Sequence, residues 1–409
     1  MKVFKLLVSL FSSFLPIQRS LILFKSFSGQ YSDSPKALSE YIHEKYPRVH
    51  IAWVQSTANK DPFPEYVDIV LPDSLKYYIY IWKASVIVDN VSSVRSSWIH
   101  KKDNCFKKIL LKYYTRKRKN QLSLSTWHGV PLKKIGMDNI SFSKDCYLST
   151  NCNFVLSGNE YTQKCLESSL GNSIPVVLSG IPRNDKLINA ADDISLIKQK
   201  LGIPENKKVF LYAPTFRNDI KVSGVMQMQN IDFHELFSTL NKRFSGEWCF
   251  VFRTHMHVAK EIKRIGLLQS LGDDIIDGNV HDDMADYLKC ADVLLTDYSS
   301  SMFDFIFTKR PCFLYVPDID DYEKKERGFY IDFSSLPFDS SKSISGLYEC
   351  ICNFDEKDYL QKCSGFLDFL GNVDDGNATS RVAEEIISIL DGKKRIDGFM
   401  NFQRTVSNG

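Results

Sequence analysis

Side chains that can bind phosphate follow several short strand-like stretches of this sequence. The stretch 121–127 leads into His128, the stretch 249–252 into Arg253-Thr254-His255, and the stretch 292–296 into Asp297-Tyr298 and three serines. One histidine in such a place is commonly structural. Two histidines, together with arginines, lysines and hydroxyls in equivalent places, are better explained by the binding of a phosphorylated ligand.

The serines after Tyr298 indicate one such anion site. The sequence ADVLLTDYSSSMFDF predicts a strand at residues 293–295 and a helix that begins near Ser300 or Ser301. Ser299 and Ser300 then lie at a helix N-terminus, where free N–H groups and the helix dipole attract phosphate. Serine also caps helices, but one serine suffices for a cap, so three in a row favour anion binding.

Arg253 and His255 are two residues apart, so their side chains point the same way from an extended segment. Such a pair suits a pyrophosphate. His255 and His257 also suggest a metal site, but no carboxylate partners are evident in the sequence. The chain has neither a Walker A pattern nor G-x-G-x-x-G, which argues against an NTPase or a dinucleotide enzyme. We therefore expect basic side chains and helix N-termini to neutralise the phosphate charge.

The elements that must position these side chains alternate between strand-like and helix-like patterns. Residues 21–27 and 50–56 are apolar and strand-like, and residues 32–46 between them have helical periodicity after a cap at Ser32 or Asp33. A second series of apolar runs begins near residue 208. In open parallel sheets, ligands bind beyond the carboxyl ends of the strands. The pattern predicts an α/β protein with two Rossmann-type parallel-sheet domains, at residues 1–180 and 181–395, and a tail at 396–409.

Composition supports this domain count and excludes several classes of protein. A chain of 409 residues is too long for one ordinary core, and 44% hydrophobic with 25% charged residues is typical of a globular protein. The net charge of +3 gives no support for a nucleic-acid partner. The ten cysteines form no C-x-x-C pair, which predicts reduced thiols in a cytoplasmic protein and argues against a zinc or redox site.

Two segments leave a membrane role open. The apolar residues 6–15 are too few to span a bilayer. They predict either a helix packed on the protein or an amphipathic helix in a membrane interface. Residues 101–121 interleave lysines and arginines with Ile109, Leu110, Leu111 and two tyrosines. Such a run is either a solvated helix face or a surface that docks on anionic lipid.

Seven motifs in a fixed order resemble one family. They are STWHGVPLKKIG, SGNEYTQKCL, GIPRNDKL, LYAPTFRND, FRTHMHV, DMADYLKCADVLLTDYSSSMFDF and DIDDYEKKERGFYIDF. With SFSGQYSDSPKALSEYI before them, they cover roughly residues 24–333 and resemble the CDP-glycerol:poly(glycerophosphate) glycerophosphotransferases of teichoic acid and capsule synthesis. The resemblance implies a GT-B-like pair of Rossmann domains facing across a cleft, the first for the acceptor and the second for a CDP-polyol.

The resemblance also implies the reaction and the partners. A polyol phosphate, with glycerol phosphate as the first choice, would pass from CDP-glycerol or CDP-ribitol to a hydroxyl of a lipid-linked or polysaccharide acceptor. CMP would be released. The enzyme would be peripheral, on an anionic membrane surface at the cytoplasmic face of the bacterial cell membrane. The family pattern implies no metal, no other cofactor and no nucleic acid.

Matching motifs assign roles to residues by resemblance. His128 of WHGVP resembles the general base that deprotonates the acceptor hydroxyl, Gly129 would permit close approach of the substrate, and Pro131 would fix the turn. His255 of RTH resembles a second essential histidine, beside the donor pyrophosphate. The other substrate-binding residues that the motifs imply are Lys133, Arg183, Pro214, Thr215, Arg217, Arg253, Thr254, Ser299, Ser300, Asp304 and Arg327.

Two motifs depart from the common pattern, and other functions stay open. WHGVP replaces the more usual WHGTP, and no proline follows the histidine of RTHMHV, but neither change removes a residue with an assigned role. The chain extends little beyond the catalytic region, which favours a priming enzyme or a capsule transferase over a long-chain polymerase. The alternatives are a CDP-ribitol ribitolphosphotransferase, a GT-B nucleotide-sugar glycosyltransferase, and a non-catalytic assembly factor, which should have lost His128 or His255.

Overall fold

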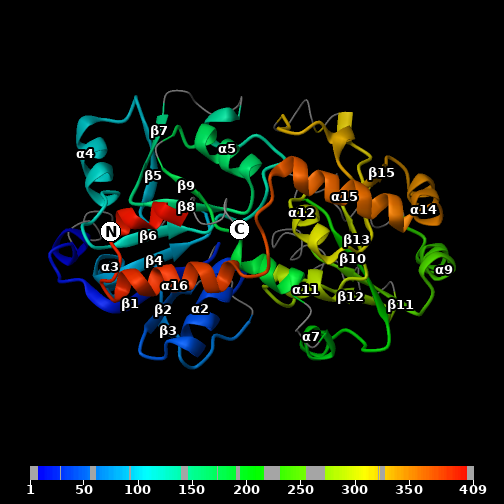
Figure 1. Cartoon of the computed structure of the whole chain (residues 1–409), viewed down its shortest axis with the longest axis horizontal. Coiled ribbons are helices and arrows are strands. Elements are labelled where there is room, and N and C mark those ends of the chain that lie inside the picture. Colours follow the sequence, from blue (N-terminus) through cyan, green and yellow to red (C-terminus); the bar gives the residue numbers. More distant parts are fainter. Residues whose placement is uncertain are drawn as a thin grey trace. The chain divides into compact units, whose positions relative to one another are not determined.

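Two parallel sheets organise the chain (Figure 1). The computed structural model describes residues 8–27, 29–55, 61–91, 94–139, 146–172, 174–189, 194–215, 231–254, 272–320, 322 and 328–402. Unit 1 comprises Met1–His128, Ile135–Asp185 and Leu370–Gly409, and unit 2 comprises Gly129–Lys134 and Lys186–Phe369. Each unit is built on one parallel sheet, so the prediction of two parallel-sheet α/β domains is confirmed.

Seven parallel strands form the sheet of unit 1, in the order β3-β2-β1-β4-β6-β8-β9. Along β1, Ile22 and Phe24 are buried on one face, and Leu21 and Leu23 are buried on the other. Strands covered on both faces need continuous apolar runs, which is why the sequence pattern predicted strands such as β1 and β2. The strands are β1 (Gln18–Lys25), β2 (His50–Val54), β3 (Asp68–Val70), β4 (Ala84–Asp89), β6 (Leu122–Ser125), β8 (Phe154–Ser157) and β9 (Val176–Leu178).

Helices cover both faces of the unit 1 sheet (Figure 1). Helices α2 and α16 pack on the face of Ile22, whereas α3 packs on the face of Leu21 and α5 packs beside β8 and β9. No residue of α4 is buried, so this helix is a solvated part of the predicted basic run. The helices are α2 (Asp33–Lys45), α3 (Leu75–Lys83), α4 (Cys105–Tyr114), α5 (Glu160–Ser169) and α16 (Ala378–Leu390).

The C-terminal residues return to unit 1. Ile386 and Leu390 of α16 belong to the same buried cluster as Ile42 of α2. Beyond α16, the ring of Phe399 stacks on that of Phe154, with centroids 5.1 Å apart. Unit 2 therefore differs from the predicted second domain at 181–395 and tail at 396–409, because the apolar face of α16 completes the core of unit 1.

Unit 2 has six parallel strands in the order β12-β11-β10-β13-β14-β15. Aromatic rings fill its core, for example Phe210 stacked on Phe250. The strands are β10 (Lys208–Ala213), β11 (Trp248–Phe252), β12 (Ile275–Asp277), β13 (Val293–Thr296), β14 (Cys312–Tyr315) and β15 (Asp339–Ser341). The helices are α7 (Ile194–Leu201), α9 (Phe233–Phe244), α11 (Met284–Cys290), α12 (Ser301–Phe305), α14 (Ile344–Cys352) and α15 (Glu356–Leu370).

Smaller elements complete the description. An antiparallel pair, β5 (Ser96–His100) with β7 (Cys146–Thr150), stands apart from the main sheet of unit 1. Short 3-10 helices include η1 (Gly136–Asp138), η2 (Pro182–Asn184), η5 (Ile306–Thr308), η6 (Phe333–Ser335) and η7 (Ile396–Phe402). Among the described helices, none has both the length and the apolar character that a bilayer-spanning segment requires.

Candidate active site

The strand orders place a ligand-binding position in each unit. In unit 1 the connections change direction between the adjacent strands β1 and β4, and in unit 2 they change direction between β10 and β13. Ligands of open parallel sheets bind beyond the carboxyl ends of the strands at such switch points. The loops to consider are therefore those after β1, β4 and β6 in unit 1, and those after β10, β11 and β13 in unit 2.

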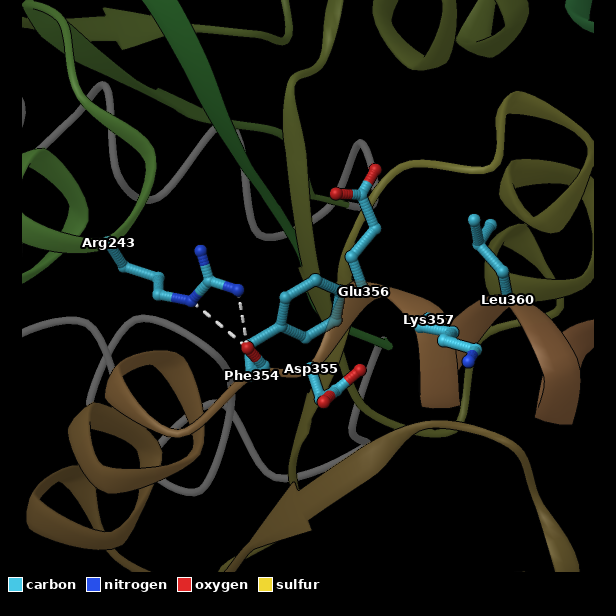
Figure 2. Close-up of a pocket in the computed structure, with 6 residues that line it drawn as sticks. All are labelled: Arg243, Phe354, Asp355, Glu356, Lys357 and Leu360. Atoms are coloured by element: carbon cyan, nitrogen blue, oxygen red, sulfur yellow. Dashed lines mark hydrogen bonds between the residues drawn. The ribbon is translucent and has the colours of Figure 1, made fainter.

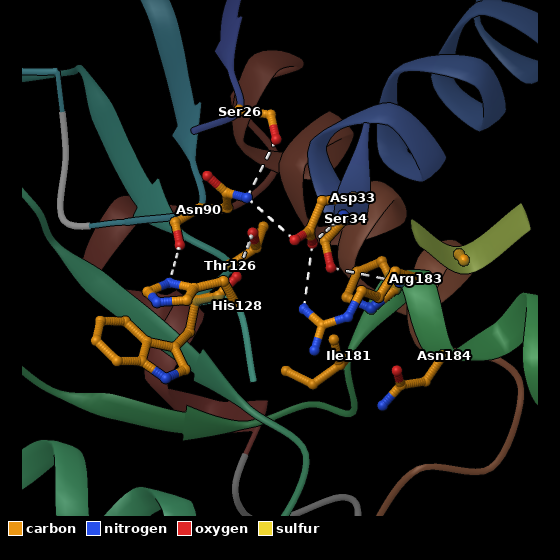
Figure 3. Close-up of polar contacts among 12 residues, drawn as sticks. Ser26, Asp33, Ser34, Asn90, Thr126, His128, Ile181, Arg183 and Asn184 are labelled. Atoms are coloured by element: carbon orange, nitrogen blue, oxygen red, sulfur yellow. Dashed lines mark hydrogen bonds and ion pairs between the residues drawn. The ribbon is translucent and has the colours of Figure 1, made fainter. Parts of the chain in front are cut away.

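His128 follows β6 and its ring is held in one orientation (Figure 3). Its Nδ1 lies 2.8 Å from the backbone carbonyl oxygen of Asn90, which follows β4. Because a carbonyl oxygen can only accept a hydrogen bond, Nδ1 carries the proton. The neutral imidazole therefore has its lone pair on Nε2, the atom that can take a proton from a substrate. Trp127 and Phe27 flank the ring, with centroids 4.4 Å and 5.8 Å from it.

Burial keeps this imidazole neutral. Loss of solvation lowers the pKa of His128 below its ordinary value of 6.5. The Asn90 carbonyl and the carboxylates of Asp33 and Asp89 act in the opposite direction, while the positive charge of Arg183 adds to the lowering. Near pH 7 the group is therefore an unprotonated base.

Asn90 joins three loops of unit 1 (Figure 3). Its side chain is fully buried. Its Oδ1 accepts a hydrogen bond from the backbone N–H of Phe27 at 2.8 Å. Its Nδ2 donates to Ser26 Oγ and to Asp33 Oδ2, both at 3.1 Å. The loop after β1, the start of α2 and the loop after β4 are thus held together beside His128.

Arg183 is part of this network and belongs to unit 1. The motif match gave this residue a substrate-binding role, which stays a prediction. Its Nη1 lies 3.2 Å from Asp33 Oδ1, and its backbone N–H donates to Ser34 Oγ at 3.3 Å. Both side chains of the ion pair are 8% exposed. The placement follows from η2, which begins after β9 and packs against α2.

The residues directly after His128 belong to unit 2. Gly129 has a φ of 151°, a backbone conformation that residues other than glycine rarely adopt. Pro131 is buried. Farther on, the backbone N–H of Lys134 donates to Gly328 at 2.8 Å, and Lys133 Nζ lies over the ring of Tyr322, 5.3 Å from its centroid. The predicted site residues of this segment are thus fixed to unit 2 by main-chain pairing.

At the carboxyl edge of the unit 2 sheet, hydrogen bonds join the loops after β10 and β13. Thr296 Oγ1 donates to the Ala213 carbonyl at 2.7 Å, and the backbone N–H of Thr215 donates to Asp297 Oδ1 at 2.8 Å. Pro214 between them is buried. The predicted residues Pro214 and Thr215 are thereby brought to the same edge as the serine-rich loop.

The serine-rich loop begins α12 as predicted. Ser300 occupies the N-cap position, but its side chain makes no capping hydrogen bond. Ser299 Oγ is 2.9 Å from Ser301 Oγ. Asp304 lies buried on α12. Ser299 Oγ also accepts from the backbone N–H of Ser301 at 3.3 Å, so a serine does bond the start of the helix, and anion binding by these serines stays a prediction.

Arg253 holds a loop of unit 2. Its Nη1 donates to the carbonyls of Gly278 and His281 at 2.7 Å and 2.8 Å, and its Nη2 donates to the carbonyl of Asp282 at 2.6 Å. The adjacent N–H of Thr254 donates to Asn279 Oδ1 at 2.9 Å. These contacts support a role in positioning the loop 278–282, whereas the direct phosphate contact implied for Arg253 stays a prediction.

Three predicted site residues, Arg217, His255 and Arg327, lie outside the described residues. In the other direction, Ser26, Asp33 and Asn90 join the site without having been singled out. For Asn90 the only sequence signal was its place at the end of the apolar run 84–90, which gives no indication of its long-range partners.

A surface hollow of ≈ 460 Å³ lies elsewhere in unit 2, at the start of α15 (Figure 2). Arg243, Phe354, Asp355, Glu356, Lys357 and Leu360 line it. The guanidinium of Arg243 donates through Nε and Nη2 to the Phe354 carbonyl, at 3.0 Å and 2.5 Å. No residue of the candidate site contributes to this hollow.

Comparison with known proteins connects this geometry to one family. The family model described as CDP-Glycerol:Poly(glycerophosphate) glycerophosphotransferase matches residues 7–388. A teichoic acid glycerol-phosphate transferase of Staphylococcus aureus is 31% identical over 90% of this chain and 93% of its own length. A teichoic acid poly(glycerol phosphate) polymerase of Bacillus subtilis is 30% identical over 92% of this chain, which spans about half the length of that relative (50%).

A solved structure and a more distant relative point to the same kind of protein. The structure of the wall teichoic acid polymerase TagF in its H444N variant with CDPG superposes with a TM-score of 0.77, at 27% identity, over 95% of this chain and 94% of that one. A teichoic acid poly(ribitol-phosphate) polymerase of Bacillus spizizenii is 27% identical over 67% of this chain. Relatives named for glycerol phosphate therefore match more of the chain than this relative named for ribitol phosphate.

Proposed function

Because the chain belongs to the CDP-glycerol:poly(glycerophosphate) glycerophosphotransferase family, we propose that it transfers glycerol phosphate from CDP-glycerol to an acceptor hydroxyl. The acceptor is a lipid-linked or polysaccharide precursor of a teichoic acid or capsule, and CMP is the second product. The preference for glycerol over ribitol rests on the relatives named for glycerol phosphate, which match over 90% or more of this chain.

The observation that carries the proposal is the 2.8 Å contact of His128 Nδ1 with the Asn90 carbonyl, from which the Nδ1–H tautomer follows. In the proposed step the acceptor oxygen attacks the β-phosphorus of CDP-glycerol and forms a new P–O bond. The bond from that phosphorus to the bridging oxygen breaks, and CMP leaves with the electron pair. The proton of the acceptor hydroxyl passes to His128 Nε2, which is unprotonated near pH 7.

Unit 2 would hold the donor through its strand-end loops. Ser299, Ser300 and the N–H groups around them would bind phosphate oxygens, and Thr215 lies at the same sheet edge. The contribution of these residues is placement and charge neutralisation, which supply most of the acceleration in phosphoryl transfer.

The test is CMP release by the purified full chain, given CDP-glycerol or CDP-ribitol together with a membrane-lipid acceptor. We expect release with CDP-glycerol and its loss in His128→Ala. Release with CDP-ribitol alone would reassign the donor. If neither nucleotide binds in calorimetry, the assignment of the substrate class is wrong.

We also propose that the enzyme is peripheral on the cytoplasmic face of the bacterial membrane, docked through its N-terminal segment. Among residues 8–15, Ser9, Ser12 and Ser13 are buried, whereas Phe11 and Phe14 are 70% and 77% exposed. The segment thus packs with its polar side inward. Apolar side chains turned outward in this way suit the interface of a lipid bilayer.

Contacts with unit 1 fix the segment in this orientation. Trp82 Nε1 donates to Ser9 Oγ at 2.8 Å, and Ser13 Oγ lies 2.6 Å from the hydroxyl of Tyr113 at the end of α4. Helix α4 itself exposes Phe106 among lysines. Basic residues beside outward-facing phenylalanines suit anionic lipid.

The cysteines bear on the proposed cytoplasmic location. Nine cysteines among the described residues are free, which supports a reducing compartment.

Co-sedimentation with phosphatidylglycerol and phosphatidylcholine vesicles tests this docking. We expect binding to the anionic vesicles, weakening with salt, and about tenfold weaker binding for the double variant Phe11→Ser/Phe14→Ser, since two large apolar groups are removed. Leu196→Ser, which changes an exposed apolar residue of α7 in unit 2, is the matched control. Equal binding of the double variant and the control would contradict the proposal.

A further inference from the structure

We infer that Asn90 is the positioning residue of the candidate base: its side chain fixes the peptide whose carbonyl holds the imidazole of His128 in the Nδ1–H tautomer. The inference rests on the proposed function for its catalytic consequence. Its structural part can be measured without turnover.

Every polar atom of the Asn90 side chain is used. Oδ1 accepts from the N–H of Phe27, and the two hydrogens of Nδ2 go to Ser26 Oγ and Asp33 Oδ2. The residue is fully buried, so water cannot replace these partners. The carbonyl of the same residue lies 2.8 Å from His128 Nδ1, and the N–H of the peptide that carries this carbonyl donates to Asp89 Oδ1 at 2.6 Å. The three side-chain contacts thus anchor the residue from which this peptide extends.

The backbone around this asparagine adopts conformations that most residues avoid. Phe27, Asp33 and Trp127 have φ values of 40°, 66° and 56°. Bulky residues such as phenylalanine and tryptophan rarely adopt positive φ, and such outliers gather at functional sites. Phe27 and Asp33 are direct partners of Asn90, and Trp127 precedes His128. The amide of Asn90 therefore lies where the loops after β1, β4 and β6 converge.

Asp33 connects this amide to a charged group. One carboxylate oxygen of Asp33 accepts from Asn90 Nδ2, and the other pairs with Arg183. This contact sets which end of the Asn90 amide faces Asp33. If the amide were flipped, its oxygen would face the Asp33 carboxylate, and two acceptors cannot form a hydrogen bond. Sequence pattern alone did not single out Asn90, since its three contacts reach residues 57 to 64 positions away in the chain.

The chemical consequence concerns which ring nitrogen has the lone pair. With the Asn90 carbonyl in place, the proton stays on Nδ1 and Nε2 is a base. If the carbonyl turns away, the neutral ring can hold its proton on Nε2 and then cannot accept one there. Turnover would fall while binding of the donor would not, because Asn90 touches no group assigned to the donor.

The experiment measures the tautomer and the turnover in the same variants. In histidine-labelled full-length protein, ¹⁵N shifts distinguish the two neutral tautomers, and the His128 signal is the one that disappears in His128→Gln. We expect the Nδ1–H tautomer in the natural chain and a mixture in Asn90→Ala. We expect kcat to fall roughly 10–100-fold, the range known for partners that orient metal-ligating histidines, with KM for CDP-glycerol unchanged.

Two further variants keep the test sharp if Asn90→Ala does not fold. Asn90→Asp retains the acceptor for Phe27 but faces its new carboxylate toward Asp33, and the tautomer should again be lost. In the double variant Asn90→Asp/Asp33→Asn, the amide at position 33 donates to the carboxylate at position 90, which reverses the natural hydrogen bond. This variant should restore both the Nδ1–H tautomer and kcat. Asn153→Asp is the matched control, because Asn153 Oδ1 accepts from Ser123 on β6 at 2.7 Å without contacting His128.

The outcomes separate two claims: that Asn90 positions His128, and that His128 is the base of the proposed reaction. A tautomer that changes with kcat, and returns in the double variant, supports the inference. If the tautomer is Nε2–H in the natural chain, or is unchanged in the Asn90 variants, the inference is wrong, whatever happens to turnover. A changed tautomer with unchanged kcat would leave the positioning role intact and remove His128 as the base of the proposed reaction.

Discussion

Arg183 Nη1 lies 3.2 Å from Asp33 Oδ1, although the two residues are 150 positions apart in the chain. Both are 8% exposed. Asp33 begins α2, and Arg183 lies in the 3-10 helix after β9, at the far edge of the sheet in strand order. The ion pair therefore connects the start of α2, beside the switch point of unit 1, to the segment just before Lys186, where the chain passes into unit 2.

Breaking this pair from one side should destabilise unit 1. We expect Arg183→Met to lower the free energy of unfolding by about 3–5 kcal/mol, because the Asp33 carboxylate is left buried without its cation. Asp33→Asn/Arg183→Met should recover much of the loss. Urea-induced unfolding followed by tryptophan fluorescence measures both. A loss below about 1 kcal/mol for the single variant would mean that solvent screens the pair.

Removing the candidate base should separate chemistry from binding. We expect His128→Ala to lower turnover by about 10²–10⁴-fold, the range for general bases, while the affinity for CDP-glycerol in calorimetry stays unchanged. His234→Ala, at an exposed histidine of α9, is the control. Near-normal turnover in His128→Ala would remove this residue from the mechanism.

The pH dependence of turnover should report the lowered pKa of His128. Protonation removes the lone pair, so kcat should fall on the acid side with a midpoint below about 6.5. The free energy of unfolding should also fall as the pH falls. The folded state binds this proton more weakly than the unfolded state, so the contribution is complete above pH ~6.5 and is lost as pH falls toward the folded pKa. A midpoint above 6.5 would contradict the assignment.

Arg253 offers a test of loop positioning in unit 2. Lysine cannot reproduce the planar fork that reaches three carbonyls, so Arg253→Lys should loosen residues 278–282. We expect weaker CDP-glycerol binding together with faster amide hydrogen exchange in that loop. Weaker binding with unchanged exchange would instead support direct contact between Arg253 and the donor.

Helix α16 should contribute to the stability of unit 1. Ile386→Ala removes a fully buried side chain from the core shared with α2. Its free energy of unfolding should fall by about 2–5 kcal/mol, the usual cost of such a truncation. Glu384→Ala, at an exposed position of the same helix, should have little effect in the same urea titration.

Most of the sheet could be predicted from the sequence, because strands buried on both faces leave apolar runs. The runs at residues 21–27 and 50–56 became β1 and β2. The strands β3, β9 and β15, with three residues each, were missed, as was the antiparallel pair β5 and β7. The helix start near Ser301 was predicted correctly because turn and capping residues act locally.

The site was predictable only in part. His128 could be found because a motif surrounds it, but its tautomer depends on a carbonyl 38 positions away. Arg183 was assigned to the second domain, whereas its partner Asp33 lies in the first βα connection. Contacts of this kind depend on which strands become neighbours, and no local pattern of hydrophobic residues records that.

The return of α16 to unit 1 has a consequence for how the protein is made. A ribosome releases the chain from its N-terminal side, so the first part of unit 1 emerges before unit 2, yet its core lacks Ala378–Leu390 until unit 2 has been made. Unit 2 needs only residues up to Phe369. Unit 2 can therefore complete its fold first. The core on the Ile22 face of the unit 1 sheet is complete only when α16 docks, so a chain stalled before residue 378 carries His128 on a sheet that lacks part of its covering layer.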